Sequence, residues 1–125
     1  MEQLTIEKFE EAYNIVRQAA AETKLVYSEY FSNQTGNKVY LKAENMQVTG
    51  AYKIRGAYFK TSTLTEEERA KGLITASAGN HAQGVARAAQ KEGIKCTICM
   101  PAGAPLSKVE STKSFGAEIV FVKDT

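Results

Sequence analysis

The sequence predicts an α/β fold with an open, mainly parallel sheet that has helices on both faces. Between Leu73 and Val122, three short apolar runs alternate with two helical patterns, and a glycine ends each helix (Gly93 and Gly116). Such short glycine-marked connections favour parallel strands joined by right-handed crossovers. A parallel sheet normally carries helices on both faces, and the sequence stops directly after a strand. We therefore expect only part of the fold here, in a fragment of a longer protein.

The first half of the chain predicts a helix, a connector, a strand and a second helix. Thr5 can cap the first helix, whose apolar residues recur at helical spacing: Phe9, Ala12, Val16, Ala19 and Ala20. The remaining segments are an extended polar connector with a turn signal, a strand marked by alternation, and a helix: Lys24 to Asn37, Val39 to Ala43, and Gly50 to Phe59.

The second half is more regular. Thr65 and Glu68 form a capping box that opens a short helix ending at Gly72. After it, strands and helices alternate in the order strand, helix, strand, helix, strand: Leu73 to Ala76, a helix that follows the loop Ser77 to Asn80 and runs through Ala89, Ile94 to Met100, Leu106 to Phe115, and Ala117 to Val122.

Composition places this chain among soluble globular proteins. It has 125 residues, a net charge of +2, 43% hydrophobic and 24% charged residues. The balanced charge gives no basic patch for nucleic acid, and no apolar run reaches the roughly 20 residues that span a membrane. Because the first residues are acidic and polar, unlike a presequence, we expect a cytoplasmic protein.

Cys96 and Cys99 form an isolated C-x-x-C motif. The surrounding alternation predicts a strand, on which residues three apart point to opposite faces. A zinc site would also need further cysteines or histidines. We therefore interpret the two residues as thiols packed in a sheet.

The loop from Thr49 to Lys53 is the first candidate functional segment. Lys53 falls in the first turn of a predicted helix, where the positive end of the helix dipole favours the neutral amine that attacks a carbonyl. Tyr52 beside it can offer a flat ring to an aromatic ligand. The alternative is that Lys53 is one more exposed lysine.

The loop from Ser77 to Gly84 is the second candidate segment. Gly79 allows a ligand to approach the backbone, and Asn80 offers both a donor and an acceptor. The alternative is structural: Ser77 or Asn80 caps the helix, and Gly84 lets that helix pack closely on the sheet. The single histidine, His81, excludes a histidine cluster.

Together, the two loops resemble the threonine dehydratases (threonine ammonia-lyases), which belong to the fold type II, tryptophan-synthase-β-like, pyridoxal 5′-phosphate (PLP) enzymes. The resemblance covers nearly the whole chain after the first helix. Five segments carry it: Glu44 to Ala57, Ser77 to Ala86, Met100-Pro101, Ala104 to Val109, and Phe115 to Glu118.

This resemblance implies roles for individual residues. Lys53 would form the Schiff base with PLP and later remove the α-proton of the substrate. Tyr52 would lie against the cofactor, and Asn80 would hydrogen-bond its 3′-oxygen. The substrate carboxylate would lie in a pocket made by the second loop: Ser77, Ala78, Gly79, Asn80 and His81. The implied reaction is the dehydration and deamination of L-threonine to 2-oxobutanoate and ammonia, and of L-serine to pyruvate.

Two positions depart from related patterns. The family usually has Ser-Phe where this chain has Ala51-Tyr52. The serine racemases of the same group carry a serine at the position of Ala78, where it acts as a second base. Alanine cannot transfer a proton, so the sequence favours a dehydratase over a racemase.

The resemblance also implies domain limits and missing parts. Residues 1–65 would belong to the larger cofactor domain and residues 66–125 to the smaller α/β domain. The family's glycine-rich phosphate loop is absent, so we expect this chain alone to bind PLP poorly and to be inactive. The full-length form is expected to be a homo-oligomer. The alternatives are a non-catalytic truncated remnant, a serine dehydratase or racemase, and an α/β binding module without a cofactor.

Overall fold

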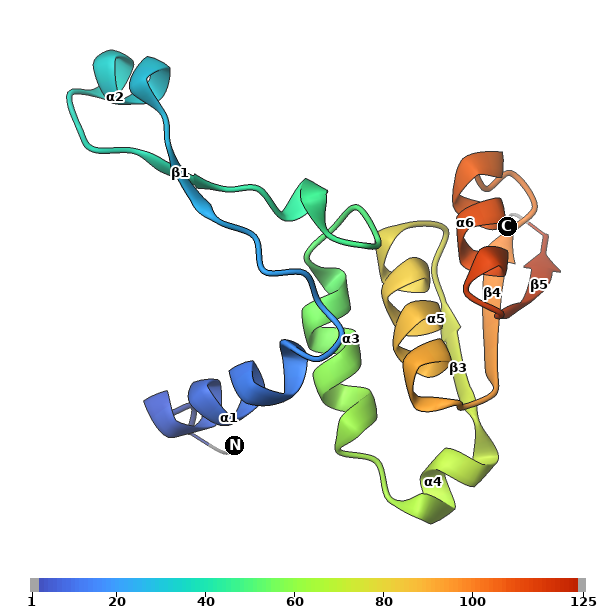
Figure 1. Ribbon diagram of the computed structural model, residues 1–125. Helices are drawn as coiled ribbons and strands as arrows, with labels where there is room; N and C mark the ends of the chain where they lie inside the picture. The colour runs from blue at the N-terminus through green and yellow to red at the C-terminus, as the bar shows by residue number, and fades with distance from the viewer. Residues whose placement is uncertain (1–2, 124–125) are drawn as a thin grey trace.

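The structure is a computed structural model that describes residues 3–123. A parallel three-stranded sheet forms one half of it. The strand order is β3-β4-β5, and both strand pairs are parallel (Figure 1). The five elements of this half follow one another as predicted: β3 (Leu73–Ala76), α5 (Asn80–Glu92), β4 (Cys96–Pro101), α6 (Leu106–Ser114) and β5 (Glu118–Val122).

Both crossover helices lie on the same face of this sheet. They share one core with alternate residues of β4 and with the residue before β5. Its buried members are Ala82, Ala86, Ala89, Cys96, Ile98, Met100, Val109 and Ala117. The opposite face carries Ile74, which is 75% exposed, and Val120. Among residues 3–123, helices therefore cover one of the two sheet faces.

The two cysteines lie on β4 as the alternation predicted. Cys96 is buried under the helices, and Cys99 is half-buried on the other face. Burial raises the pKa of the Cys96 thiol to about 11, because the apolar core disfavours the charged thiolate. These are packed thiols that point apart.

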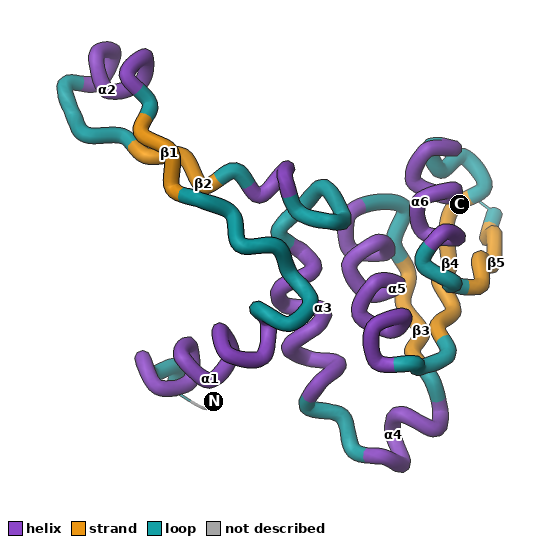
Figure 2. Tube along the Cα trace, in the orientation of Figure 1, coloured by secondary structure: helices purple, strands orange, loops and turns teal. Residues whose placement is uncertain are grey.

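The first half of the chain places one helix along α5, whereas another part of it projects away from α5 as an arm (Figure 2). Its elements are α1 (Ile6–Val16), β1 (Leu25–Tyr27), α2 (Glu29–Thr35), β2 (Tyr40–Lys42), a 3₁₀ turn η1 (Glu44–Met46), α3 (Lys53–Ser62) and α4 (Glu66–Lys71). Helix α3 packs along α5, and α1 packs against α3. A second core holds these helices together: Ala19, Ile54, Tyr58 and Ala88.

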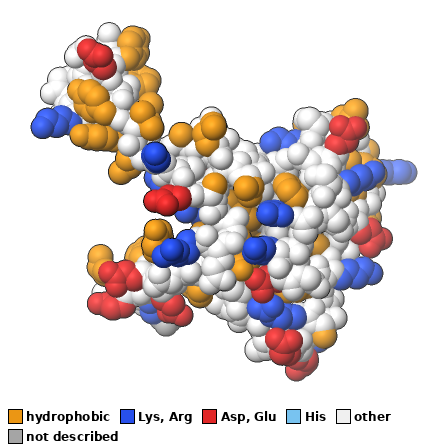
Figure 3. Space-filling model, viewed as in Figure 1, with side chains coloured by type: hydrophobic (Ala, Val, Ile, Leu, Met, Phe, Trp, Pro, Cys, Tyr) orange, Lys and Arg blue, Asp and Glu red, His pale blue; other side chains and the backbone are white. Residues whose placement is uncertain are grey.

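One prediction for this half needs correction. The segment from Lys24 to Asn37 is no extended connector, because it contains β1 and α2. The Oγ of Ser28 accepts the N–H of Phe31 at 3.3 Å and caps α2, and Gly36, at φ 68°, ends it. These are ordinary start and stop signals. Strands β1 and β2 pair antiparallel, and hydrophobic side chains gather on this projecting arm (Figure 3).

Other boundaries agree or shift slightly. The capping box of α4 is present, with reciprocal bonds between Thr65 and Glu68. Thr5 occupies the N-cap of α1 but makes no side-chain cap. Within the predicted stripe of α1, Val16 is buried, whereas Phe9 is 61% exposed. No helix among the described residues is long and apolar enough to cross a membrane.

Candidate cofactor site

Lys53 is the first residue of α3, three residues later than the predicted start of this helix. The delay arises at Gly50, whose φ of 70° turns the chain before the helix can begin. The N–H of Gly50 donates to the carbonyl of Gln47 at 2.8 Å, and the buried hydroxyl of Thr49 donates to the carbonyl of Ala51 at 3.1 Å. A tight turn therefore presents the lysine.

The side chain of Lys53 is exposed and lies beside that of Tyr52. Its Nζ is 5.5 Å from the centre of the Tyr52 ring, close enough for a cation–π contact. None of the ion pairs found among residues 3–123 involves Lys53. The amine is thus available to a ligand that approaches the ring of Tyr52.

Ser77 begins the second loop and supports the start of α5, whose N-cap is Gly79. Its N–H donates to the carbonyl of Cys99 at 3.0 Å, which continues the sheet by one residue. Its Oγ accepts the N–H groups of Gly79 and Ala82, each at 3.3 Å. The structural interpretation holds in part for Ser77: the N-cap is Gly79, but the Ser77 oxygen satisfies an N–H of the first turn. Because both bonds use the oxygen as acceptor, the hydroxyl proton is still available to a ligand.

Asn80 is the first residue of α5 and does not cap it. Its Oδ1 accepts a hydrogen bond from Nζ of Lys108, on α6, at 2.8 Å. The same Nζ donates to Oε1 of Gln83 at 3.2 Å. No local pattern predicts this contact of Lys108, because 28 residues separate it from Asn80 and only the packing of α6 on α5 joins them.

Gly84 brings the two loops together. A Cβ at Gly84 would lie 3.1 Å from the carbonyl carbon and oxygen of Lys53 and 3.3 Å from the nitrogen of Ile54. The expectation that Gly84 packs α5 on the sheet is therefore wrong. This glycine faces α3, and its missing side chain allows the lysine turn to approach α5.

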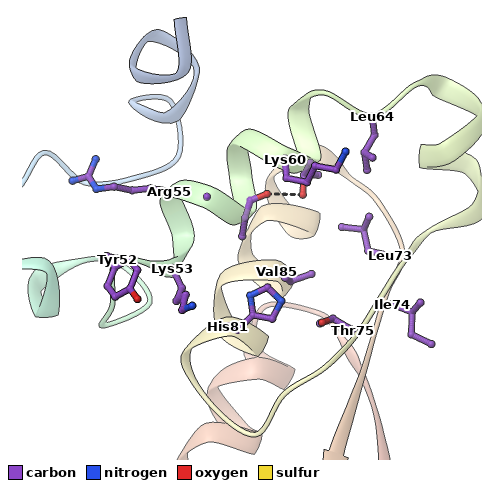
Figure 4. Close-up of a pocket in the computed structure, with 13 residues that line it drawn as sticks. Tyr52, Lys53, Arg55, Lys60, Leu64, Leu73, Ile74, Thr75, His81 and Val85 are labelled. Carbon is purple, nitrogen blue, oxygen red and sulfur yellow. Dashed lines mark hydrogen bonds between the residues drawn. The ribbon is translucent and has the colours of Figure 1, made fainter. Parts of the chain in front are cut away.

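A groove of about 580 Å³ runs between α3, α5 and β3. Figure 4 shows the side chains of Lys53, Tyr52 and His81 at one end of it. Most of the remaining lining is apolar, and it includes Val85 and Leu73. The residues from Ser77 to Asn80 do not line the groove, although they directly precede His81, which does.

A polar network behind the lysine turn ties α3 to the preceding chain. Glu44 accepts hydrogen bonds from Arg55 at 2.8 and 2.9 Å, and from the hydroxyl of Thr23. The side-chain amide of Gln47 joins it by bonding both the N–H and the carbonyl of Ala21 at 2.9 Å. The Arg55 bonds lower the pKa of Glu44 to about 2. This support was not foreseen from the sequence.

A family model for pyridoxal-phosphate dependent enzymes matches residues 16–125. The chain belongs to this family. It is 51% identical over 117 residues to an L-threonine ammonia-lyase of Thermotoga maritima, covering 94% of this chain and 29% of that protein. It is 50% identical over 112 residues to a catabolic L-threonine dehydratase of Staphylococcus aureus, covering 89% of this chain and 32% of the relative.

Solved structures agree with the fold type II assignment. Maize serine racemase superimposes with a TM-score of 0.92 at 35% identity, covering 99% of this chain and 38% of the racemase. A threonine deaminase of Solanum lycopersicum gives 0.83 at 35% identity, covering 98% and 37%. This PLP-family chain therefore spans about a third of the length of the relatives that it matches.

The residues of the two loops fit PLP chemically. An exposed primary amine, that of Lys53, suits the aldehyde of the cofactor, and the Tyr52 ring lies beside this amine. Because Lys108 occupies Oδ1 of Asn80, the amide nitrogen of Asn80 is the group left to donate to a ring oxygen. The N–H groups in the first turn of α5 suit an anion. Lys53, Tyr52 and Asn80 are thus the residues that would hold the cofactor.

Proposed function

We propose that this chain carries the lysine-bearing part of a PLP-dependent lyase that dehydrates and deaminates L-threonine. The products are 2-oxobutanoate and ammonia, and L-serine is a second substrate that gives pyruvate. The observation that carries the proposal is the contact of Gly84 with the backbone of Lys53, because it holds the lysine turn beside the helix that begins at Asn80. The names of the threonine ammonia-lyase relatives support the choice of substrate.

Each residue has a defined task in this proposal. PLP, when bound, supplies an aldehyde for the substrate amine and a ring that stores electrons. Lys53 would hold the cofactor through its amine, and the same amine, when free, would take the α-proton of the substrate. Asn80 would donate a hydrogen bond from its side-chain amide to the 3′-oxygen of the ring. The substrate carboxylate would lie on the loop formed by Ser77, Gly79, Asn80 and His81. The free hydroxyl proton of Ser77 and the first N–H groups of α5 would hold it there.

Serine racemase is the second candidate, because a racemase is among the similar structures. Ala78 argues against it. A racemase needs a proton donor on the face of the substrate opposite Lys53, and a methyl group carries no transferable proton. We therefore keep elimination as the proposed reaction.

We also propose domain limits, an oligomeric state and a cellular location for the enzyme. Residues 1–65 belong to the cofactor domain and residues 66–125 to the smaller domain. The full-length protein acts as a homo-oligomer in the cytoplasm. The dense packing of α3 on α5 crosses this boundary, so the two parts meet beside Lys53.

Borohydride reduction of the full-length, PLP-loaded protein tests the proposal, because it fixes the cofactor to the lysine that holds it. Peptide mass spectrometry is expected to find the tag on Lys53. In a separate activity assay, the turnover of threonine is expected to exceed that of serine. Lys53→Ala should abolish tagging and turnover, whereas the exposed Lys91→Ala should retain both. A tag on another lysine would refute the site. Unchanged ligand binding in Lys53→Ala would favour a plain binding module. A wild-type protein that acquires no tag would favour a non-catalytic remnant.

A further inference from the structure

We propose that Lys108 is a positioning residue for the cofactor site, which it serves by fixing the orientation of the Asn80 amide. This inference rests on the proposed PLP function. Lys108 is expected to touch neither cofactor nor substrate. Its task is to hold Oδ1 of Asn80 so that Nδ2 faces the cofactor ring.

The chemistry of the contact determines which end of the amide faces outward. An ammonium group has three N–H donors and no acceptor. Lys108 can therefore bind Asn80 only through the amide oxygen, which it does at 2.8 Å. The amide nitrogen is left to point away from α6. A hydrogen-bond donor at that place suits the 3′-oxygen of PLP, and a flipped amide would present an oxygen to it instead.

The Lys108 side chain is itself held in place. Its Nζ also donates to Oε1 of Gln83, which is 5% exposed and therefore cannot swing into solvent. The Lys108 backbone is fixed within α6, where its N–H donates to the carbonyl of Pro105 at 2.9 Å and its carbonyl accepts the hydroxyl of Thr112 at 2.7 Å. A buried amide and a rigid helix turn thus set the position of the ammonium.

Asn80 needs such an anchor because its side chain is exposed. A free asparagine at a helix start samples several rotamers, and ordering its side chain on binding costs affinity. None of the ion pairs found in residues 3–123 gives Lys108 a carboxylate partner. Within that described part of the chain, the hydrogen bonds of the Lys108 ammonium go to the amide oxygens of Asn80 and Gln83, which makes the ammonium an anchor for Asn80.

The test is a double-mutant cycle in the full-length protein with Lys108→Met, Asn80→Ala and the double variant. The measured quantity is the dissociation constant of PLP from the refolded or freshly prepared apoprotein, by equilibrium dialysis. Lys113→Met, an exposed lysine on the same helix, is the matched control. Lys108→Met should weaken PLP binding roughly tenfold, about the effect of one charged hydrogen bond. In the Asn80→Ala background, Lys108→Met should have almost no further effect.

Several outcomes would overturn the inference. Wild-type affinity in Lys108→Met would do so, and so would additive losses in the double variant, since Lys108 would then act independently of Asn80. A lower melting temperature of apo Lys108→Met together with additive losses would identify a merely structural lysine. Absent threonine turnover in a wild-type protein that binds PLP would instead refute the proposed reaction and leave this inference standing.

A measurement on the unmutated protein covers the case in which Lys108→Met does not fold. Apoprotein labelled with ¹⁵N at asparagine should show a rigid Asn80 side-chain amide, with an order parameter of about 0.8. Asn80→Ala identifies the resonance by its loss, and the exposed Asn33 is the reference for a mobile side chain. An order parameter below about 0.6 for Asn80 would contradict the anchoring.

Discussion

Gly84 of α5 lies directly against the backbone of Lys53 at the start of α3. A Cβ built on Gly84 would lie 3.1 Å from both the carbonyl carbon and the carbonyl oxygen of Lys53. Backbone atoms cannot move aside as the end of a flexible side chain can. Even one methyl group here must shift the lysine turn relative to the Asn80 loop.

Gly84→Ala is expected to reduce activity more than stability. Alanine gains about 1 kcal/mol of helix propensity over glycine, whereas the overpacking against Lys53 costs about 1–3 kcal/mol. The net loss of unfolding free energy should therefore be small. Displacement of the lysine should lower turnover of the full-length enzyme roughly ten- to hundredfold.

Gly56→Ala is the matched control for the stability of this variant. Gly56 lies inside α3, and a Cβ there would meet no atom within 4 Å. This substitution should raise the free energy of unfolding by up to about 1 kcal/mol, as urea titration would measure. Equal stabilisation by Gly84→Ala would mean that the contact with Lys53 exerts no constraint.

The Glu44–Arg55 pair predicts a loss of stability in acid. The hydrogen bonds from Arg55 lower the pKa of Glu44 from 4.5 to about 2. A carboxylate with a depressed pKa stabilises the fold above pH 4.5, and this contribution is lost as the pH falls from 4.5 towards 2. Glu44→Gln should cost about 1–3 kcal/mol near neutral pH, and its difference from wild type should shrink below pH 4.

Glu67→Gln is the matched control, in which an exposed ion pair is removed instead of the Arg55-bonded one. Glu67 pairs with Lys71 at 2.7 Å, but both side chains are largely exposed. Exposed pairs of this kind contribute about 0.5 kcal/mol or less. Chemical denaturation of the two variants at several pH values should therefore separate them, and equal losses would contradict the role given to the network.

Tyr58 predicts a second pH dependence, in the alkaline range. A hydrogen bond with Glu92, followed by burial, raises the pKa of Tyr58 to about 12. Its contribution is therefore complete below pH 10 and is lost as the pH rises from 10 towards 12. Tyr58→Phe should lower the unfolding free energy by about 1–2 kcal/mol at pH 7.

The exposed Tyr30→Phe should leave stability within about 0.5 kcal/mol of wild type. Tyr58 is 4% exposed, and its partner Glu92 also pairs with Arg69 of α4 at 2.8 Å. Thermal melts at pH 7 and pH 11 would reveal the predicted narrowing between Tyr58→Phe and wild type. A constant difference across this range would show that the phenol of Tyr58 does not titrate as expected.

Ala78 predicts a gain of function in the full-length protein. Ala78→Ser would place a hydroxyl where a racemase carries its second acid–base group. L-Serine incubated with this variant should yield D-serine at a rate on the order of 10²-fold above wild type, as chiral chromatography would measure. Ala102→Ser, in an exposed loop, should produce none above background. If Ala78→Ser formed D-serine no faster than wild type, the preference for elimination over racemisation would be determined by other residues.

The sequence predicted the parallel unit from β3 to β5 because its signals are local. Alternating apolar residues, a capping box and glycine stops act within a few residues of one another. The α2 segment has equally local signals in Ser28 and Gly36, although its polar composition predicts an extended connector. The sequence also identifies the two candidate loops. The roles of the residues in these loops remain predictions.

Only the tertiary structure decided how those loops meet. The approach of Gly84 to Lys53 depends on α3 packing along α5, and the bond from Lys108 to Asn80 depends on α6 packing beside it. Such contacts join residues about 30 positions apart. Their geometry is set by how whole helices fill space against one another, which no local pattern of residues specifies.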